Sequence, residues 1–225
     1  MSTRLLYFVT EDWYFCSHRL PLAVAARDAG FDVTVVTRVR EHGESIRAAG
    51  LSLIPFEIAR SGMNPLREIV TLWHLIALYR RVRPDVVHHV AMKPVLYGSL
   101  AARLAGVPGV INALAGMGWL FTSAGGGAHL IKRGVRVALR RLLAHGVALV
   151  QNPDDAEFLI RLGVPRGNVR CIAGSGVDLA RFRPAVEPGG VPVIVLPATF
   201  TVEPWIPPPA FPDTVQSVTF AVPVP

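Results

Sequence analysis

Short, almost continuously apolar runs alternate along the chain with longer stretches in which apolar and polar residues are mixed. The apolar runs are rich in β-branched residues, as is typical of strands buried on both faces of a parallel sheet. We predict strands at LLYFVT (5–10), DVTVVTR (32–38), SLIPFEI (52–58), DVVHHV (85–90), GVINAL (109–114), ALVQN (148–152) and VRCIA (169–173).

The stretches between these strands favour helices. Several of them end in Gly, and the third begins at Asn64-Pro65 and ends before Pro84, which are ordinary start and stop signals. Alternating strands and helices imply right-handed βαβ units. The predicted fold class is therefore α/β, a doubly wound, mostly parallel, Rossmann-like sheet. Such sheets bind ligands at the carboxyl ends of their strands, so the residues that follow each strand are the first functional candidates.

Composition is that of a globular protein. The chain has 225 residues, of which 51% are hydrophobic and 17% charged, enough to bury a sizeable core. The two cysteines, Cys16 and Cys171, fit neither a disulfide framework nor a metal-ligand spacing, which favours a reducing compartment. We expect no secretory signal after Arg4 and no apolar segment near the roughly 20 residues that span a bilayer. A cytoplasmic protein is expected.

The formal net charge of +7 predicts an anionic partner. No helix-turn-helix, zinc or RNA-binding signature occurs, so we expect no nucleic acid and favour phosphate groups or lipid headgroups. The most basic segment, HLIKRGVRVALRRLLAH (129–145), either lies on an anionic membrane or covers the sheet with a solvated basic face. On a helical projection, Ile131, Val135, Ala138, Leu139 and Leu142 share one side, with Lys132, Arg133, Arg136 and Arg140 beside or opposite them.

The composition changes after Ala198. The last 27 residues hold seven prolines but no Gly, Lys or Arg, although the preceding 198 residues hold all 23 basic residues. Proline at this density disfavours both helices and central strands. We predict a Rossmann-like domain (1–184), a linker with the first strand of a second domain (185–198), and a disordered, possibly frameshifted tail (199–225).

The first predicted strand is followed closely by Ser17, His18 and Arg19, ahead of Pro21. Ser17 fits a helix N-cap and Pro21 a first turn, which would place His18 and Arg19 beside free backbone N–H groups. An Arg there can bind a phosphate through two N–H groups, and a His can exchange a proton. The alternative is a His that only caps the helix and an Arg that is solvated.

Further candidates lie in the fourth strand and directly after it. His88 and His89 are adjacent in a strand and point to opposite faces, so they cannot share a metal, and we predict no metal site. One of them can be a core histidine. Lys93, beyond the strand end, is either a phosphate ligand or a surface lysine.

A glycine-containing loop follows the fifth strand. Gly116 and Gly118 in ALAGMGWLF would let the backbone approach a ligand closely. Trp119 would stack on a sugar ring or an acyl chain, or pack in the core. No G-x-G-x-x-G fingerprint follows the first strand, which disfavours a nicotinamide enzyme.

Several stretches together resemble the N-terminal domain of bacterial family 4 glycosyltransferases, especially those that extend undecaprenyl-diphosphate-linked glycans. The resemblance rests on SHRLPLAVAARDAGFDVTVVTR, SGMNPLREI, VVHHVAMKPVLYGSLAARLAGVP, INALAGMGWLF, NPDDAEFLIRLGVP and GSGVDLARFRP. It extends from the first strand to about Ala198 and implies one half of a GT-B architecture, whose second half holds the nucleotide-sugar donor.

The resemblance also implies site roles. His18 would be catalytic and, with the AGMGW loop, would face the acceptor and the reacting phosphate, while Lys93 would help hold the lipid diphosphate. From their position after the first strand, Ser17 and Arg19 are also predicted to bind the acceptor or its phosphate. Asn152 and Glu157 in NPDDAEF would lie near the cleft. The implied reaction is retaining transfer of a hexosyl or N-acetylhexosaminyl group from a nucleotide sugar to a lipid-linked saccharide. Neither a cofactor nor a metal is implied, and the protein would sit peripherally on the inner face of the membrane.

The sequence departs from the family after VPVIVLPA (191–198), because neither an Arg-bearing segment nor a Lys-Gly turn follows. We therefore expect a truncated protein that is inactive by itself. Two alternatives remain at this point: a non-catalytic anion-binding or nucleotide-binding Rossmann module, and a fragment of a sugar-nucleotide epimerase.

Overall fold

The computed structural model describes residues 2–58, 65–114, 126–174 and 176. All of them belong to one unit of the chain, Met1–Gly176. The predicted tail (199–225) and the whole of the predicted linker with the first strand of a second domain (185–198) lie outside the described residues, so the division into three parts stays a prediction.

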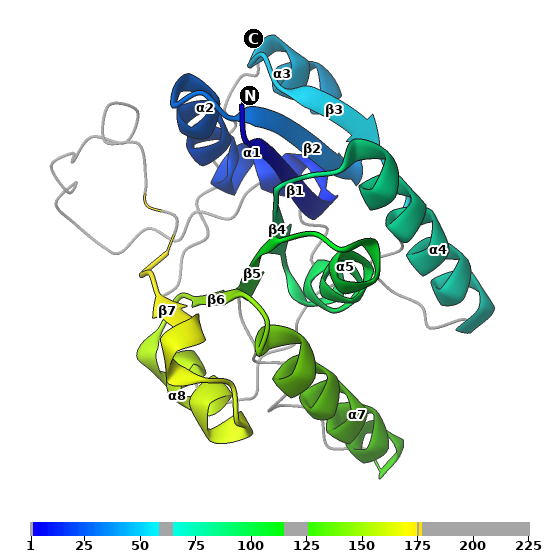
Figure 1. Cartoon of the computed structure of the whole chain (residues 1–225), viewed down its shortest axis with the longest axis vertical. Coiled ribbons are helices and arrows are strands. Elements are labelled where there is room, and N and C mark those ends of the chain that lie inside the picture. The colour runs from blue at the N-terminus through cyan, green and yellow to red at the C-terminus, as the bar shows by residue number, and fades with distance from the viewer. Residues whose placement is uncertain (1, 59–64, 115–125, 175, 177–225) are drawn as a thin grey trace, which may run out of the picture. The chain divides into compact units, whose positions relative to one another are not determined.

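Seven parallel strands form one sheet within the described residues, in the order β3-β2-β1-β4-β5-β6-β7 (Figure 1). The strands are β1 (Arg4–Glu11), β2 (Asp32–Arg38), β3 (Ser52–Pro55), β4 (Val86–Val90), β5 (Gly109–Leu114), β6 (Val147–Val150) and β7 (Val169–Cys171). Each coincides with one of the apolar runs, and the predicted α/β fold class is confirmed.

The strand order reverses direction between β1 and β4. From β1 the chain builds outward through β2 to β3, and then returns to place β4 on the other side of β1. Tyr7 lies opposite His88 and Val9 lies opposite Val90 in this pair. In open parallel sheets such a switch point opens a crevice at the carboxyl ends of its two strands. The crevice expected here lies where β1 and β4 end.

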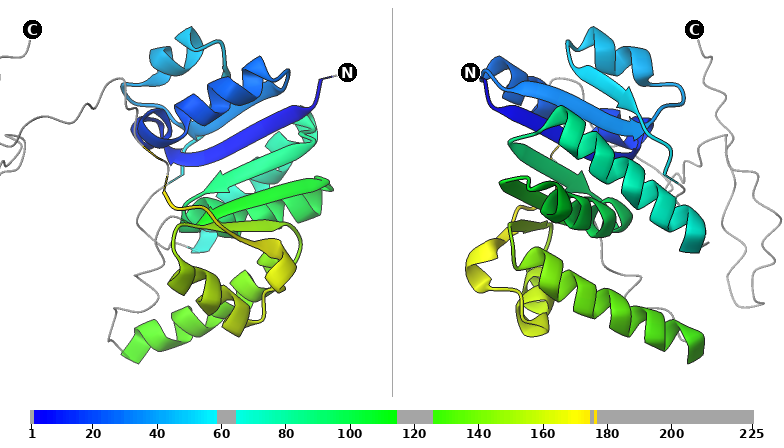
Figure 2. Two further views of the ribbon diagram at one scale, coloured as in Figure 1. Left: turned by 90° about the vertical axis from the view of Figure 1, so that its left-hand side faces the viewer. Right: turned by 45° about the vertical axis from the view of Figure 1, so that its right-hand side comes forward.

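Helices cover both faces of the sheet (Figures 1 and 2). They are α1 (Asp12–His18), α2 (Leu20–Asp28), α3 (Gly43–Ala48), α4 (Pro65–Val82), α5 (Met92–Ala105), α7 (Gly126–Leu143) and α8 (Pro153–Leu162), with a short 3-10 turn η1 (Arg166–Asn168). The long helix predicted to stop before Pro84 ends at Val82, as expected. Within the described residues, none of the helices is long and apolar enough to cross a membrane.

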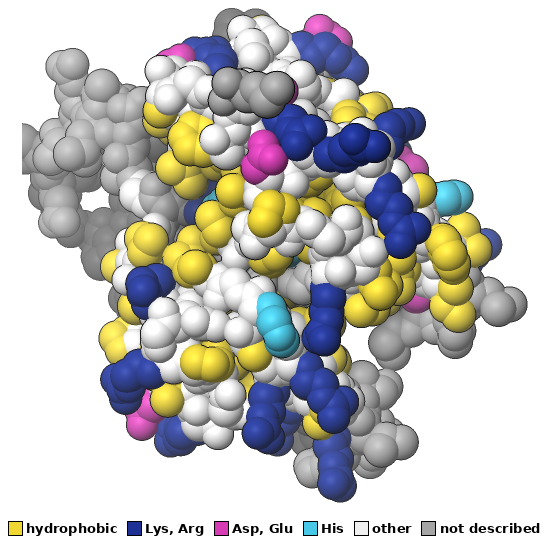
Figure 3. All heavy atoms as spheres, viewed as in Figure 1, with side chains coloured by type: hydrophobic (Ala, Val, Ile, Leu, Met, Phe, Trp, Pro, Cys, Tyr) yellow, Lys and Arg dark blue, Asp and Glu magenta, His cyan; other side chains and the backbone are white. Residues whose placement is uncertain are grey.

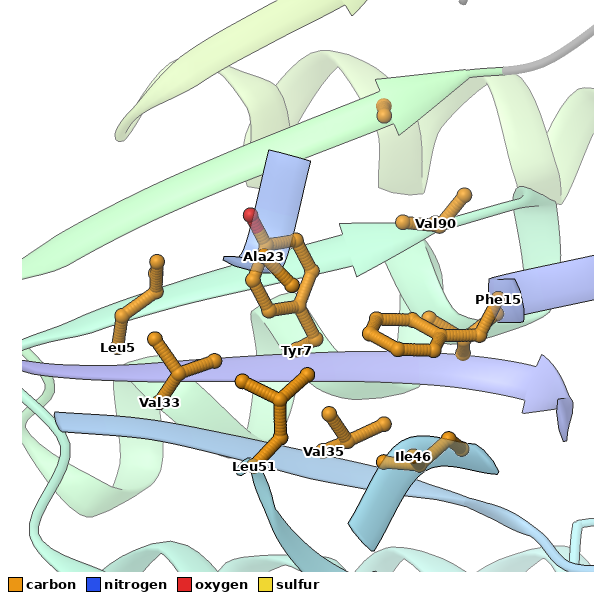
Figure 4. Packing of buried hydrophobic residues seen from close by; sticks show 11 residues of the cluster. Leu5, Tyr7, Phe15, Ala23, Val33, Val35, Ile46, Leu51 and Val90 are labelled. Atoms are coloured by element: carbon orange, nitrogen blue, oxygen red, sulfur yellow. The ribbon is translucent and has the colours of Figure 1, made fainter. Parts of the chain in front are cut away.

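The core has two sides because successive strand residues point to opposite faces. From β1, Tyr7 packs with Phe15 of α1 and Val35 of β2 on one face (Figure 4). Phe8 packs on the other face with residues of α4 and α5, among them Leu75. Burial of each such side chain stabilises the fold by about 1.5–3 kcal/mol. The burial of β1 on both faces explains why its sequence is almost continuously apolar.

Candidate functional site

The site begins where β1 passes directly into α1. The Asp12 side chain is fully buried and accepts hydrogen bonds from the backbone N–H groups of Trp13, Arg40 and His42, at 2.8, 2.6 and 2.9 Å. Burial by itself would raise the pKa of Asp12, but these donors hold the pKa below its usual value. The carboxylate therefore ties the start of α1 to the segment that follows β2, and so fixes the carboxyl edge of the sheet.

Ser17 is not the N-cap that the sequence predicted. It lies in the last turn of α1, and Arg19 occupies the N-cap position of α2 without a capping hydrogen bond from its side chain. The prediction was wrong because Asp12 begins a separate helix directly after the strand. Pro21 does lie in the first turn of α2, as expected.

His18 ends α1 and is exposed. Its ring stacks on Tyr14 with centroids 4.4 Å apart and planes 12° apart, and its Nδ1 lies 2.6 Å from Oγ of Ser17. The exposed Trp13 meets Tyr14 edge to face. His18 is therefore an accessible imidazole that its neighbours hold in one orientation at the carboxyl edge.

Arg19 is not solvated. Only 9% of this residue is exposed, and its Nε is buried without a hydrogen-bond partner in the described part of the chain. Its charge acts on Tyr7 and His88, whose rings stack with centroids 4.9 Å apart. Burial, followed by the nearby charges of Arg19 and His89, lowers the pKa of His88 to about 3, so His88 is neutral at physiological pH. Arg19 thus brings a positive charge into the interior beside the switch point.

The β4 side of the switch point is strained. Ala91 joins β4 to α5 with φ 80° and ψ 162°, a conformation that costs an L-residue about 1–3 kcal/mol and is found mostly at functional sites. The helix that follows directs its N-terminal N–H groups toward the carboxyl edge. Among these first residues is Lys93, whose Nζ forms an ion pair with Glu68 of α4 at 2.8 Å and lies 5.6 Å from the Tyr97 ring centroid. A phosphate at Lys93 would have to compete with Glu68.

His89 belongs to a buried network on the opposite face of the sheet. Its Nε2 lies 3.1 Å from the Tyr79 hydroxyl and its Nδ1 lies 2.7 Å from Oδ1 of Asn112, which also accepts from Ser99 at 2.8 Å. The prediction that His88 and His89 face opposite sides is confirmed. Among the described residues, no group of three or more His, Cys, Asp or Glu side chains could hold a metal ion. Independence of a metal remains a prediction.

Asn152 and Glu157 lie farther along the same edge. Asn152 is the N-cap of α8: its Oδ1 accepts from the Asp155 backbone N–H at 2.7 Å, and its Nδ2 donates to the Asp155 carboxylate at 2.9 Å. Glu157 is exposed and pairs with Arg161 at 3.8 Å. With strands about 4.8 Å apart, β6 lies roughly 14 Å from β1. Asn152 therefore does not join His18 and Arg19 in one cluster.

Gly116, Gly118 and Trp119 lie outside the described residues, so the predicted loop site stays a prediction. Sequence reasoning missed Asp12, Ala91 and Tyr14. An acidic residue directly after a buried strand was a signal that could have identified Asp12. Neither a strained alanine nor a ring that stacks on His18 has a sequence signature.

Residues 4–148 match the family model described as "Glycosyl transferase 4-like". The chain belongs to this family. The match covers β1 to the start of β6 and so includes both sides of the switch point. Family membership favours a transferase over the binding-module and epimerase alternatives.

Two characterised enzymes are similar to this member of the family. One is the N,N'-diacetylbacillosaminyl-diphospho-undecaprenol alpha-1,3-N-acetylgalactosaminyltransferase of Campylobacter jejuni, which is 28% identical over 169 residues, or 74% of this chain and 44% of that protein. The other is the UDP-Gal:alpha-D-GlcNAc-diphosphoundecaprenol alpha-1,3-galactosyltransferase of Escherichia coli, 28% identical over 55% of this chain and 31% of that protein. The chain spans less than half the length of either relative.

The fold also matches that of solved glycosyltransferases. Sucrose-phosphate synthase from Thermosynechococcus elongatus superposes with a TM-score of 0.58 at 15% identity, over 81% of this chain and 50% of that one. At this identity the likeness concerns the fold alone. It agrees with the Rossmann-like half of a GT-B architecture that the sequence predicted.

A second cationic region lies away from the switch point. Arginine side chains gather over the part of the surface in Figure 3 that contains α7. The exposed members on α7 are Arg133, Arg136, Arg140 and Arg141, while Leu139 and Leu143 of the same helix are fully buried. On α4 of the same helix layer, Ile69, Val70 and Trp73 are 54%, 53% and 62% exposed.

A pocket of about 450 Å³ lies near the amino-terminal edge of the sheet, between α5 and α7. Arg103, Arg141 and His145 line it. The two arginines lie in the last turns of their helices, where a cation offsets the negative helix end. This pocket is therefore a less favourable anion site than the switch point, where helices begin.

Proposed function

We propose that this family member forms the acceptor-binding part of an enzyme that transfers a sugar from a nucleotide sugar to a lipid-diphosphate-linked saccharide. The observation that supports it best is the combination, at one switch point, of an exposed imidazole, His18, with a buried arginine, Arg19, whose Nε has no hydrogen-bond partner among the described residues. The names of both similar enzymes specify a diphosphoundecaprenol-linked saccharide, which is the same class of acceptor.

The proposed roles follow from position. The exposed His18 hydrogen-bonds the attacking hydroxyl of the acceptor and takes up its proton as the new glycosidic bond forms and the bond from the sugar to the nucleotide phosphate breaks. Arg19 and the N-terminus of α5, with Lys93, bind phosphate oxygens. Asn152, Glu157 and the loop with Gly116, Gly118 and Trp119 are further proposed contacts. The hydroxyl attacks from the same face of the sugar that the nucleotide phosphate leaves, so the transfer proceeds with retention, and it does so without a metal or cofactor.

The nucleotide-sugar donor is proposed to be held by a second, donor-binding domain, as the GT-B resemblance implies. Stabilisation of the departing nucleotide phosphate is usually the largest catalytic contribution in such reactions. We therefore propose that the chain by itself binds the acceptor but transfers no sugar.

The membrane is the proposed location of the acceptor. We propose that α7, through Arg133 and Arg136, and α4, through Trp73, bring the cytoplasmic protein to an anionic membrane surface. Replacement of both arginines by Gln should weaken binding to phosphatidylglycerol vesicles about thirtyfold. The same change at Arg161 and Arg166, which are also exposed, is the matched control. Equal vesicle binding by all variants would contradict the membrane proposal.

The reaction is tested by joining residues 1–198 to the donor domain of a family member and measuring transfer from UDP-sugars to a polyprenyl-diphosphate saccharide. His18→Ala should lower kcat/KM about 100-fold or more. His145→Ala is the control, because His145 is also exposed but lies near the opposite edge of the sheet. Failure of every UDP-sugar, or equal loss in both variants, would refute the proposed function.

A further inference from the structure

The charge of Arg19 is unusual because the fold buries it without a counterion. No carboxylate lies within ion-pair distance of its guanidinium among the residues that the structure describes, whereas Arg38 nearby pairs with Glu11. Its Nε also lacks a hydrogen-bond partner. A buried cation is strongly unfavourable unless an anion and hydrogen-bond acceptors surround it. Among the described residues, no carboxylate pairs with Arg19 and no acceptor reaches its Nε.

His88, which is close enough to feel the charge of Arg19, also has a buried nitrogen without a described hydrogen-bond partner. The residue is 4% exposed, and its Nε2 is buried without a hydrogen-bond partner within the described chain. The ring is held in place by stacking on Tyr7, so it cannot turn away freely. In the Nε2–H tautomer of the neutral imidazole, this unpartnered nitrogen is a hydrogen-bond donor. In that tautomer, Nε of Arg19 and Nε2 of His88 are two buried donors without an acceptor among the described residues.

The surroundings favour an anion. Arg19 is the N-cap of α2, whose first N–H groups no side chain caps. On the other side of the switch point, the strained Ala91 directs the start of α5 to the same edge. We propose that Arg19 and His88 bind a phosphoryl group of a diphosphate at the inner end of the crevice. The class of ligand rests on the proposed function, whereas the anion site rests on the unpartnered atoms.

The proposal makes an unusual prediction about stability. Arg19→Met removes an uncompensated charge and keeps an apolar side chain of similar length. Without an anion, the melting temperature of the variant should therefore equal or exceed that of the parent chain. With inorganic pyrophosphate at a hundredfold excess over its Kd, the parent should gain about 5–10 °C and the variant should gain almost nothing.

The matched control is Arg40→Met. Arg40 lies at the same edge, carries the same charge and is exposed. Its replacement should leave the pyrophosphate-induced shift intact. His88→Phe keeps the stacked ring but removes the donor, and should weaken pyrophosphate binding about tenfold. A lower melting temperature of Arg19→Met in anion-free buffer, or an unchanged pyrophosphate shift, would overturn the proposal.

Two soluble probes identify the source of the diphosphate. Farnesyl diphosphate represents the lipid-linked acceptor and UDP represents the donor. Stronger Arg19-dependent binding of farnesyl diphosphate would assign the site to the acceptor, and stronger binding of UDP would overturn that assignment. Transfer by the joined enzyme without any Arg19-dependent anion binding would refute this site while leaving the proposed function intact.

A different observation concerns Ser17. Its hydroxyl lies 3.2 Å from the Tyr14 carbonyl oxygen and 2.6 Å from Nδ1 of His18. A hydroxyl has one hydrogen, and the carbonyl can only accept it. Both contacts are satisfied only if Ser17 donates to Tyr14 and accepts from an Nδ1–H of His18. We infer that Ser17 is a positioning residue that leaves the Nε2 lone pair of His18 free to accept the acceptor's proton.

Nitrogen-15 NMR of the His18 ring tests this inference in the chain itself. The Nδ1–H tautomer should predominate in the neutral ring of the parent chain and should decline in Ser17→Ala, and Ser17→Thr should restore it. The same predominant tautomer in Ser17→Ala as in the parent would overturn the inference. Because the measurement needs no sugar transfer, it can fail independently of the proposed function, on which its catalytic meaning rests.

Discussion

Gly98 of α5 packs directly against the buried His89 ring. A Cβ at this position would lie 2.4 Å from Cδ2 and 2.5 Å from Nε2 of His89. The ring cannot move aside without breaking its contacts with Tyr79 and Asn112, which hold it at both nitrogens. Gly98→Ala should therefore destabilise the fold, although alanine is the better helix former.

The expected loss of stability in Gly98→Ala is the sum of three contributions. Overpacking costs about 1–3 kcal/mol, and the loss of one buried hydrogen bond costs about 1–3 kcal/mol. The improved helix propensity returns about 1 kcal/mol. The expected net loss is about 3 kcal/mol, which corresponds to a fall in melting temperature of about 6–12 °C for a chain of this size.

Thermal and urea denaturation, followed by circular dichroism, measure this loss. Gly134→Ala in α7 is the matched control, because a Cβ there meets nothing within 4 Å. That variant should gain about 1 kcal/mol from helix propensity. In a double-mutant cycle, His89→Ala should relieve most of the cost of Gly98→Ala. Equal stabilisation by Gly98→Ala and Gly134→Ala would refute the close packing described for His89.

Three further predictions concern other residues. Burial lowers the pKa of His88 to about 3 and that of His89 to about 4, so the unfolded chain binds protons more readily than the folded chain. The contribution of these residues to the free energy of unfolding should be complete above about pH 6.5 and should fall as the pH drops from 6.5 toward 3–4. Urea midpoints across that range measure this fall. Asp12→Ala leaves three backbone N–H groups without their acceptor and should cost about 2–4 kcal/mol in urea denaturation; a loss below 0.5 kcal/mol would contradict the anchoring role of Asp12. Glu68→Gln removes the carboxylate that pairs with Lys93 and should tighten pyrophosphate binding about threefold to tenfold in calorimetry; unchanged or weaker binding would contradict competition between Glu68 and a phosphate for Lys93.

The strands were predictable because a parallel sheet buries them on both faces. The run 5–10 has almost no polar position, and it forms the most deeply buried strand, β1. The long helix between Pro65 and Val82 was predictable from its prolines. The order of the strands, and hence the switch point, depends on pairing between β1 and β4, about 80 residues apart in sequence, which local patterns do not encode.

The site was only partly predictable. The position of His18 and Arg19 after the first strand identified them as candidates, but not the burial of Arg19. The N-cap assignment of Ser17 failed because residues far along the chain, Arg40 and His42, stabilise an earlier helix start at Asp12. Such contacts arise from the tertiary structure, so no local pattern near Ser17 reveals them.

We propose that the carboxyl edge at the switch point binds the diphosphate of a lipid-linked acceptor. Chemical-shift mapping with a soluble short-chain polyprenyl-diphosphate saccharide on the nitrogen-15-labelled chain tests it most directly. The largest changes are expected at His18, Arg19 and the first residues of α5, around Lys93. Changes confined to the pocket lined by Arg103 and Arg141, or no changes at all, would contradict it.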